Sequence, residues 1–346
     1  MIKLSLNIPT YNRDSYLREN LNGIISQLRN KKLESIVEIN ISDNASTDKT
    51  RDICAEIKNN NSDIDITYQR NEANLGPDLN FIAAMQMARG EYSILFGDDD
   101  FFEPDAISRI LEIIKKDSSI DFILSNRISI DAFGNEIKRK PFLKEDVDTE
   151  VFDFSNRNNV RAYFSLVNDL GAVFTFISSV VYKTNIIEEV GVFDSRCIGS
   201  NYSFLNYWWR SLLTGKKVLY NNEYLIKATI DGATNNNYGR GLKRLLVDTD
   251  GLSKIANYSI EDKGYRRDFL AAVRRSIPME TIYRAYFGNI KQAKETLFVS
   301  MEACGWSPVE IKQWKTILSL RQSFYACMHY LIPNFLIGFA TLKKHL

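Results

Sequence analysis

Three consecutive carboxylates, Asp98, Asp99 and Asp100, come directly after the apolar run Ile94-Leu95-Phe96-Gly97. Adjacent like charges repel one another, and a shared cation lowers the cost of holding them together. Oxygen ligands at the end of a strand suit a hard divalent ion such as Mg²⁺ or Mn²⁺, and such an ion in turn binds phosphate. A solvated acidic turn is the alternative, and the triplet alone fits both interpretations.

Polar loops also follow the three strands that we predict upstream of the triplet. They occupy residues 9–13, 43–46 and 71–76, each directly after an apolar run. In a parallel sheet the carboxyl ends of the strands meet at one edge, and ligands bind outside that edge. We therefore expect all four loops to converge on one binding site.

Several residues of these loops could bind a nucleoside diphosphate. They are Pro9, Tyr11, Arg13, Asp43, Asn44, Asn74 and Gly76. Asp43 offers planar hydrogen-bonding partners to a base, Arg13 can bind a phosphate bidentately, and Gly76 lets backbone approach a ligand closely. Each also has a structural alternative as a turn residue, a helix cap or a solvated side chain.

The elements that must position these loops alternate along the first part of the chain. We predict strands at 3–8, 37–42, 64–69, 92–96 and 122–125, and helices at 16–28, 48–58, 78–88 and 104–115. This alternation predicts an α/β fold with a mostly parallel, doubly wound sheet and helices on both faces. Beyond about residue 131 the pattern loosens, and from about residue 240 it is helical.

Composition excludes several classes of function. With 44 basic and 43 acidic residues the net charge is +1, so nothing favours nucleic acid as a partner. The chain has 2 histidines, which excludes a His-rich metal site or a Ser/His triad. The 4 cysteines form no Cys-x-x-Cys pair, and we expect reduced thiols in a cytoplasmic protein. We also expect no transmembrane helix, because no apolar window is long enough.

In order and spacing, the chain resembles glycosyltransferase family 2, which has the GT-A fold. The matching stretches are Leu4–Arg13 (LSLNIPTYNR), Ile41–Thr50 (ISDNASTDKT), Asn71–Phe81 (NEANLGPDLNF) and Gly90–Asp100 (GEYSILFGDDD). The resemblance covers about residues 2–130 and fades afterwards. Within the family, the LFGDDD and NLGPDLNF stretches are most similar to O-antigen transferases of the abequosyltransferase type.

The resemblance implies a role for each matched residue. Pro9, Tyr11, Arg13 and Asp43 would hold the base and ribose of the donor. In the triplet, Asp98 would face the ribose beside the metal, Asp100 would bind Mn²⁺ or Mg²⁺, and Asp99 would contact the sugar or a metal-bound water.

The implied reaction moves a hexose or deoxyhexose from a nucleotide diphosphate to a saccharide acceptor. The family resemblance further implies an acceptor linked to undecaprenyl diphosphate, an intermediate of O-antigen or surface polysaccharide. The enzyme would then work in the cytoplasm or peripherally on the inner face of the cytoplasmic membrane.

The catalytic base is where the chain departs from the family pattern. Family members often carry a Glu-Asp pair downstream of a Gly-x-Phe-Asp turn. Here the turn is present at residues 191–194, but residues 199–203 read Gly-Ser-Asn-Tyr-Ser. Asp194 and then Asp231 are the candidate bases, and each has an alternative as a turn residue. A retaining transferase would need no such base.

We predict a GT-A domain over residues 1–240, with a nucleotide-sugar-binding half (1–130) and an acceptor half (131–240). A helical C-terminal region would follow at 241–346. One of its helices should begin at Ser307-Pro308, with Ser as the N-cap and Pro in the first turn. Basic residues mixed with aromatic and aliphatic ones suit an interfacial helix on an anionic membrane. A helix packed on the catalytic domain is the alternative.

Two other functions remain open at this point. A nucleotidyltransferase would share the phosphate and metal requirements, but it would usually have a Gly-rich basic loop, and residues 4–13 contain no glycine. A catalytically silent sugar-nucleotide-binding protein would fit the missing Glu-Asp pair but not the intact triplet. Substitution of Asp100 would separate a silent binder, which has no turnover to lose, from an enzyme.

Overall fold

The computed structural model describes residues 1–131, 133–229, 242–277, 281–282, 286 and 291–331, with the backbone alone at 291–294 and 320–331. The strands are β1 (Leu4–Thr10), β2 (Val37–Asp43), β3 (Asp65–Arg70), β4 (Tyr92–Leu95), β5 (Asp100–Phe102), β6 (Phe122–Ile130), β7 (Glu136–Arg139), β8 (Glu150–Asp153), β9 (Val180–Lys183) and β10 (Lys217–Thr229). The helices are α1 (Asp14–Lys31), α2 (Thr50–Asn60), α3 (Gly76–Gln86), α4 (Ala106–Lys116), α5 (Arg157–Leu166), α6 (Ile186–Val190), α7 (Phe204–Leu212), α9 (Leu242–Ser259), α10 (Lys263–Ser276), α12 (Lys291–Ala303) and α13 (Pro308–Leu331). Short 3₁₀ turns are η1 (Leu170–Val173), η2 (Ile177–Ser179) and η3 (Ser195–Cys197).

All described strands belong to one sheet, whose main path runs β3-β2-β1-β4-β9-β6-β10-β5. Strands β1 to β4 pair in parallel, as predicted from the strand and helix alternation. Strand β9 pairs antiparallel with β4 and β6, and β5 pairs antiparallel with β10. The sheet is therefore mixed, and its parallel half carries the predicted binding loops.

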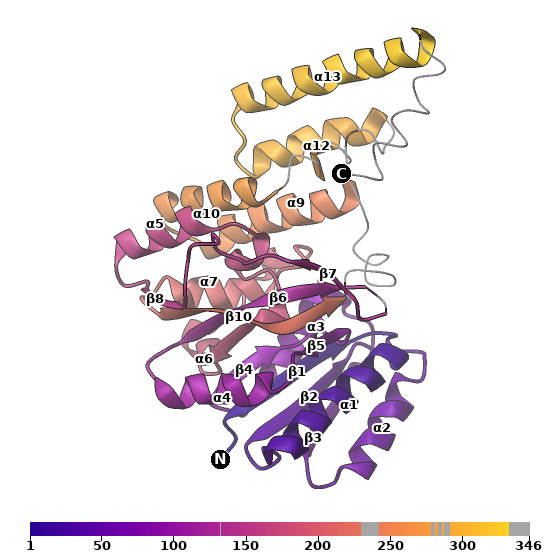
Figure 1. Ribbon diagram of the computed structural model, residues 1–346, viewed down its shortest axis with the longest axis vertical. Coiled ribbons are helices and arrows are strands. Elements are labelled where there is room, and N and C mark those ends of the chain that lie inside the picture. Colours follow the sequence, from indigo (N-terminus) through magenta and orange to yellow (C-terminus); the bar gives the residue numbers. More distant parts are fainter. Residues whose placement is uncertain (132, 230–241, 278–280, 283–285, 287–290, 332–346) are drawn as a thin grey trace.

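Helices cover both faces of this sheet (Figure 1), and the buried apolar side chains form two hydrophobic cores. Helices α1, α2 and α4 contribute to one core, and α3, α7 and the C-terminal helices contribute to the other. Successive side chains of a strand point to opposite faces. On β1, Leu4, Leu6 and Ile8 therefore enter the first core, whereas Ser5 and Asn7 face the opposite side, where α3 packs.

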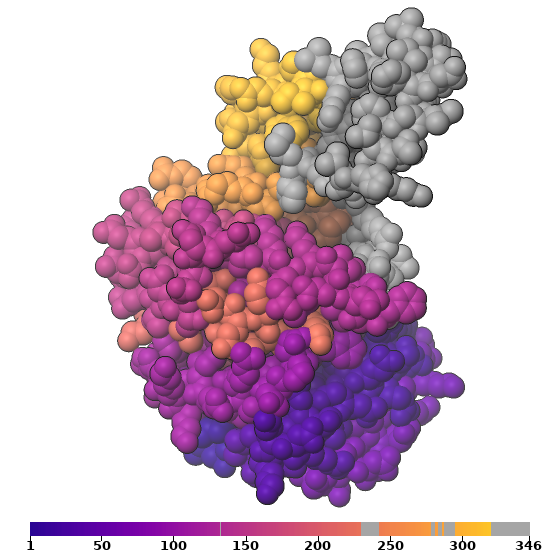
Figure 2. All heavy atoms as spheres, viewed as in Figure 1, coloured from indigo at the N-terminus to yellow at the C-terminus, as the bar shows by residue number. Residues whose placement is uncertain are grey.

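The second core is extended by the C-terminal helices α9, α10, α12 and α13. The N-terminal strands and α12–α13 lie at opposite ends of the molecule (Figures 1 and 2). Helix α13 begins at Pro308 as predicted, and Ser307 and Glu310 form a reciprocal cap. Within the described residues, no helix is both long and apolar enough to cross a bilayer. The basic and apolar segment 332–346, part of the predicted membrane anchor, lies outside those residues.

Steric crowding at Gly171 gives a test of the second core. A Cβ added there would lie 2.2 Å from Cε1 of the buried Phe142 ring. We expect Gly171→Ala to lower the free energy of unfolding by about 1–3 kcal/mol, because the ring cannot yield without disturbing its neighbours. Gly23→Ala is the matched control, since Gly23 is exposed in the middle of α1 with open space around it. It should raise the stability by about 0.5–1 kcal/mol. Chemical denaturation measures both, and equal effects would contradict the packing described.

Candidate active site

Each carboxylate of the acidic triplet is bound by a different part of the chain. The Thr10 hydroxyl at the end of β1 donates to Asp98 Oδ2 at 2.7 Å. Arg13 Nη1 lies 3.3 Å from Asp99 Oδ2. The Ser178 hydroxyl of η2 donates to Asp100 Oδ2. The predicted convergence of the β1 loop on the triplet is therefore present.

The backbone of the triplet is held as firmly as its side chains. The Asn20 amide of α1 donates to the carbonyls of Gly97 and Asp100 at 3.0 and 2.7 Å. The Thr229 hydroxyl donates to the carbonyl of Asp99 at 3.0 Å. A Cβ on Gly97 would lie 2.6 Å from Asp100 Oδ2, so the tight turn requires glycine here.

Burial makes the triplet electrostatically costly. Asp99 and Asp100 are 8% and 5% exposed. Loss of solvation and then the neighbouring charge of Asp99 raise the pKa of Asp100 to about 8, and the same causes raise the pKa of Asp98. The folded protein thus holds these protons more tightly than an unfolded chain would, which favours binding of a cation in their place.

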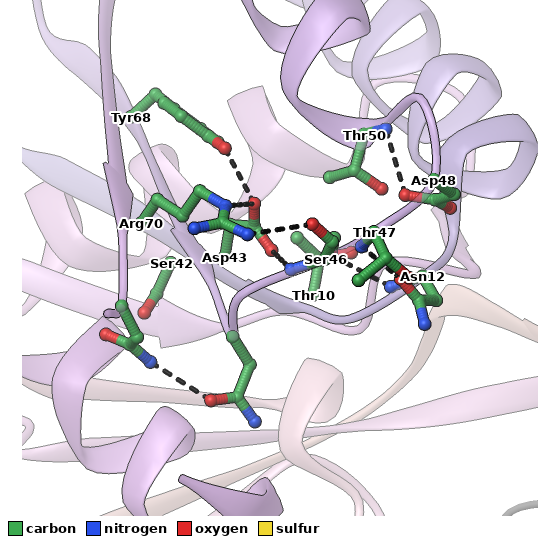
Figure 3. A network of polar contacts seen from close by, with 12 residues as sticks. Thr10, Asn12, Ser42, Asp43, Ser46, Thr47, Asp48, Thr50, Tyr68 and Arg70 are labelled. Atoms are coloured by element: carbon green, nitrogen blue, oxygen red, sulfur yellow. Dashed lines mark hydrogen bonds and ion pairs between the residues drawn. The ribbon is translucent and has the colours of Figure 1, made fainter. Parts of the chain in front are cut away.

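Asp43 is fully buried at the end of β2, and its carboxylate has several partners (Figure 3). The Tyr68 hydroxyl donates to Oδ2 at 2.6 Å, and the Ser46 amide donates to Oδ1 at 2.9 Å. Arg70 Nε lies 3.6 Å from Oδ2. The carboxylate is fixed in place by two elements, and the sequence had not singled out Tyr68 or Arg70.

Asn44 joins the β2 loop to the loop before α3. Its amide group donates to Asn74 Oδ1 at 2.9 Å and to the carbonyl of Gly76 at 3.2 Å. Its Oδ1 accepts from the Leu75 amide and from the Asn71 side chain. The predicted site residues Asn44, Asn74 and Gly76 therefore lie together beside Asp43.

The remaining residues of the β1 loop lie at the same edge. Pro9 is buried on β1 and is opposite Ser42 of β2, one residue before Asp43. Tyr11 follows β1 and is 39% exposed, so its ring is available to a ligand. These positions are compatible with a wall beside a base.

Asp78 is a site residue that the sequence analysis did not single out, although it stands within a quoted motif. It is 4% exposed and accepts hydrogen bonds from the amides of Gly199, Asn201 and Ser203 at 2.7, 3.2 and 3.1 Å. Gly199 and Asn201 have positive φ, a geometry in which successive amides point toward one anion. Asp78 thus fastens the loop 199–203, where the family's Glu-Asp pair was expected, to the N-terminus of α3.

The same loop borders a cavity of about 370 Å³. Gly199 and Asn201 line one side of it. The other side is formed by α9 through residues that include Leu242, Lys243 and Asp250. The cavity therefore offers both apolar and charged surface next to the loop held by Asp78.

The structure does not bring either candidate base, Asp194 or Asp231, into the cluster around the triplet among the residues that it describes. Asp194 caps η3, and its carboxylate accepts from the backbone amide, Nε and Nη2 of Arg196 at 2.6–3.1 Å. These bonds lower the pKa of Asp194, which makes it a weak base. The geometry favours a capping role. Asp231 lies outside the described residues.

The donor set fits a hard divalent cation only with help from a ligand. Among the residues that the structure describes, no three His, Cys, Asp or Glu side chains are arranged to hold a metal ion. Mg²⁺ is usually held by one or two carboxylates together with substrate phosphates. Asp98, partly buried, and Asp100, buried, both have raised pKa values and can supply such carboxylates.

A mixed sheet with a parallel N-terminal half, and with carboxylates gathered at the carboxyl ends of its strands, is typical of the GT-A fold, the architecture of nucleotide-sugar-dependent transferases. The comparisons with known proteins agree. The family model described as "Glycosyl transferase family 2" matches residues 5–183, and the chain belongs to this family. The protein is accordingly a glycosyltransferase, and this excludes the nucleotidyltransferase alternative.

Among its relatives is the abequosyltransferase RfbV of Salmonella typhimurium, 31% identical over 296 residues that cover 84% of this chain and 86% of the relative. An uncharacterized glycosyltransferase, MJ1057 of Methanocaldococcus jannaschii, is 26% identical and covers 67% and 72% of the two chains. The predicted similarity to abequosyltransferases is thus confirmed.

Two solved structures share the fold. TarS 1–349 of S. aureus, in complex with UDP, superposes with a TM-score of 0.58 at 16% identity and covers 93% of this chain and 92% of its own. The mannosyltransferase PcManGT of Pyrobaculum calidifontis, in complex with GDP-Man and Mn²⁺, gives 0.54 at 14% identity, with coverage of 92% and 84%. At these identities the similarity establishes the GT-A fold.

The raised pKa of Asp100 sets the pH dependence of stability. Below about pH 3 the carboxyl group is protonated in the folded and unfolded states alike. As the pH rises toward 8, the unfolded chain releases the proton first, so the folded state binds more protons and stability falls. We expect the melting temperature of the ligand-free, metal-free protein to drop between about pH 5 and 8.

Asp100→Asn should flatten this slope and raise the stability at pH 8 by on the order of 1–3 kcal/mol. Asp63→Asn, an exposed carboxylate change, is the control and should leave the slope unchanged. A variant at position 100 that is less stable than wild type at pH 8 would contradict the electrostatic cost described here.

Asp194 provides a second test. If it only caps η3, Asp194→Asn should lower the stability by about 1 kcal/mol or less and leave the turnover within a few-fold of wild type. A general base would instead contribute about 10²–10⁴-fold to the rate. Steady-state kinetics and thermal unfolding of the same preparation separate the two, and a loss of 10²-fold would restore Asp194 as the base.

Proposed function

We propose that the protein is a metal-dependent glycosyltransferase that moves a hexose or deoxyhexose from a nucleoside diphosphate to a saccharide acceptor. The observation that carries this proposal is the acidic triplet, whose three carboxylates are each fixed by a separate element at the edge where Asp43 also lies. A site fixed in this way is preorganised for a charged ligand.

Nucleotide-sugar binding would divide among the converging loops. Asp43 and Asn44, with Pro9 and Tyr11, would hold the base and ribose, and Asn74 and Gly76 would close that end of the site. Asp98 and Asp99 would lie beside the ribose and sugar. The Asp43 carboxylate already accepts hydrogen bonds from Tyr68 and Ser46. A hydrogen bond from a base or ribose would be added to these two.

Asp98 and Asp100 would hold Mn²⁺ or Mg²⁺ together with the donor phosphates. When bound, such an ion neutralises the diphosphate and so assists its departure. The structure of the fold neighbour PcManGT is a complex with GDP-Man and Mn²⁺, which supports this choice of ion. Arg13 orients Asp99 and adds positive charge at the same edge.

We assign residues 1–130 to the donor and 131–240 to the acceptor, with residues 241–346 as a C-terminal helical region. The cavity between loop 199–203 and α9 could receive part of a saccharide acceptor, since it combines apolar and charged surface. We further propose a lipid-linked acceptor from surface-polysaccharide synthesis, as the resemblance to O-antigen transferases implies, and hence contact with an anionic membrane surface. For an inverting enzyme we favour the second candidate, Asp231, as the catalytic base, because Asp194 is paired with Arg196.

A nucleotide panel tests the proposal. CDP, UDP, GDP and dTDP are each added to the full chain with and without Mn²⁺, and the melting temperature is recorded. A ligand that binds only the folded state raises it by mass action. We expect one diphosphate to stabilise the protein, and more strongly with Mn²⁺. Asp100→Asn should abolish the Mn²⁺-dependent part of the shift.

Two outcomes would contradict the proposal in different ways. If no nucleotide shifts the melting temperature under any condition, the donor site assigned here is wrong. If the shift is the same with Mn²⁺ as with EDTA, the metal dependence is wrong and the nucleotide site stands.

A further inference from the structure

Arg127 lies in the middle of β6 (Phe122–Ile130). It is the one partly exposed residue of this strand, and all the remaining residues of β6 are buried. Its guanidinium carbon is 4.4 Å from the centre of the Phe176 ring. Stacking on an aromatic face holds a guanidinium in one orientation while its N–H groups stay available at the edges.

Phe176 is itself held firmly, because its ring packs against the hydrophobic cores on both faces of the sheet. It directly precedes η2, whose Ser178 donates to Asp100 Oδ2 and accepts from the amide of Gly97 at 2.9 Å. One short segment therefore supports both Arg127 and the acidic triplet.

The strand register places Arg127 on the same face of the sheet as Asp100. On β10, Ile226 is opposite Phe102 of β5 and Arg127 of β6, and two residues later Ala228 is opposite Asp100 and Ser129. Residues two apart on a strand share a face. The charge of Arg127 accordingly reaches Asp100 and partly offsets the rise in the pKa of that carboxyl.

Arg127 differs from the other arginine near the triplet in what it contacts. Arg13 is engaged with Asp99. In the described part of the chain, Arg127 forms no ion pair and donates no side-chain hydrogen bond, and its guanidinium stacks on the Phe176 ring. A guanidinium carries five N–H donors in a planar fork that matches the oxygens of a phosphate.

We propose that Arg127 binds the outer phosphate of the donor's nucleoside diphosphate, the phosphate that carries the sugar. This inference rests on the proposed function. Transfer breaks the bond between sugar C1 and an oxygen of that phosphate, and the oxygen keeps the electron pair. The acceptor oxygen bonds to C1 and releases its proton. Arg127 stabilises the charge that develops on the departing phosphate oxygen, which is strongest in the transition state.

The test compares nucleotides with and without the outer phosphate. The full-length protein is titrated calorimetrically with the preferred nucleoside diphosphate and with the matching monophosphate, in Mn²⁺ and again in EDTA. We expect Arg127→Gln to weaken binding of the diphosphate by roughly tenfold or more. Its affinity for the monophosphate should stay within about twofold of that of the wild type. Arg127→Lys should fall between, because it keeps the charge and loses the fork.

Arg139→Gln is the matched control. Arg139 is stacked over Tyr224, with its guanidinium carbon 4.9 Å from the ring centre, and it pairs with Glu136. It lies opposite Ile128 on β6 and therefore faces the other side of the sheet from Arg127. The substitution should change neither affinity. Phe176→Leu removes the stacking surface. It should weaken binding of the diphosphate, by a smaller factor than Arg127→Gln does, and leave binding of the monophosphate unchanged. Thermal unfolding of each variant verifies that it is folded.

The result that overturns the proposal is an Arg127→Gln protein that binds the diphosphate as wild type does, or that loses both nucleotides equally. The second pattern would assign Arg127 a structural role. If wild-type protein binds none of the nucleotides, the proposed function fails first, and this inference fails with it.

Discussion

Repulsion among three adjacent carboxylates is the constraint around which the site is organised. Each carboxylate takes a partner from a separate element, namely Thr10 from β1, Arg13 from the start of α1 and Ser178 from η2. The backbone of the turn is secured by Asn20 of α1. None of these contacts is local in sequence, so the triplet can be held together only after the sheet, α1 and η2 have assembled. Formation of the site and formation of the fold are therefore one event.

The sequence predicted those parts that follow from periodicity and from strand direction. Alternating apolar runs located β1 to β4 and their helices, and the carboxyl-end rule brought residues such as Asp43 and Asn44 near the triplet. The sequence could not predict hydrogen-bonding partners that come from distant segments of the chain. Ser178 stands in a run without a polar motif, and Asp78 contacts amides more than a hundred residues away. Asp194 was misleading because acids in turns serve as caps as readily as they serve as bases, and only the position of Arg196 distinguishes these roles.

The two faces of the sheet are built from different interactions. Under α1 and α2 the sheet is apolar, whereas under α3 it carries buried polar groups. Ser42 donates to Asn80 of α3 at 2.8 Å, and Asn80 donates back to the carbonyl of Ser42 at 3.1 Å. Apolar contacts tolerate small shifts, but such paired hydrogen bonds are directional and define one position. Helix α3 and the loop before it, which carries Asn74 and Gly76, are thereby located more sharply than packing alone would locate them.

Asp78 contacts the loop 199–203 through main-chain amides and the Ser203 hydroxyl, and the three amides exist whatever side chains the loop carries. The tether constrains the path of the loop but hardly its sequence, apart from the two positions with positive φ. Substitutions elsewhere in the loop can therefore accumulate without detaching it from α3. A lineage could in this way change what the neighbouring cavity accepts and retain the donor side intact, so the fold separates the part of the enzyme that can diversify from the part that must stay constant.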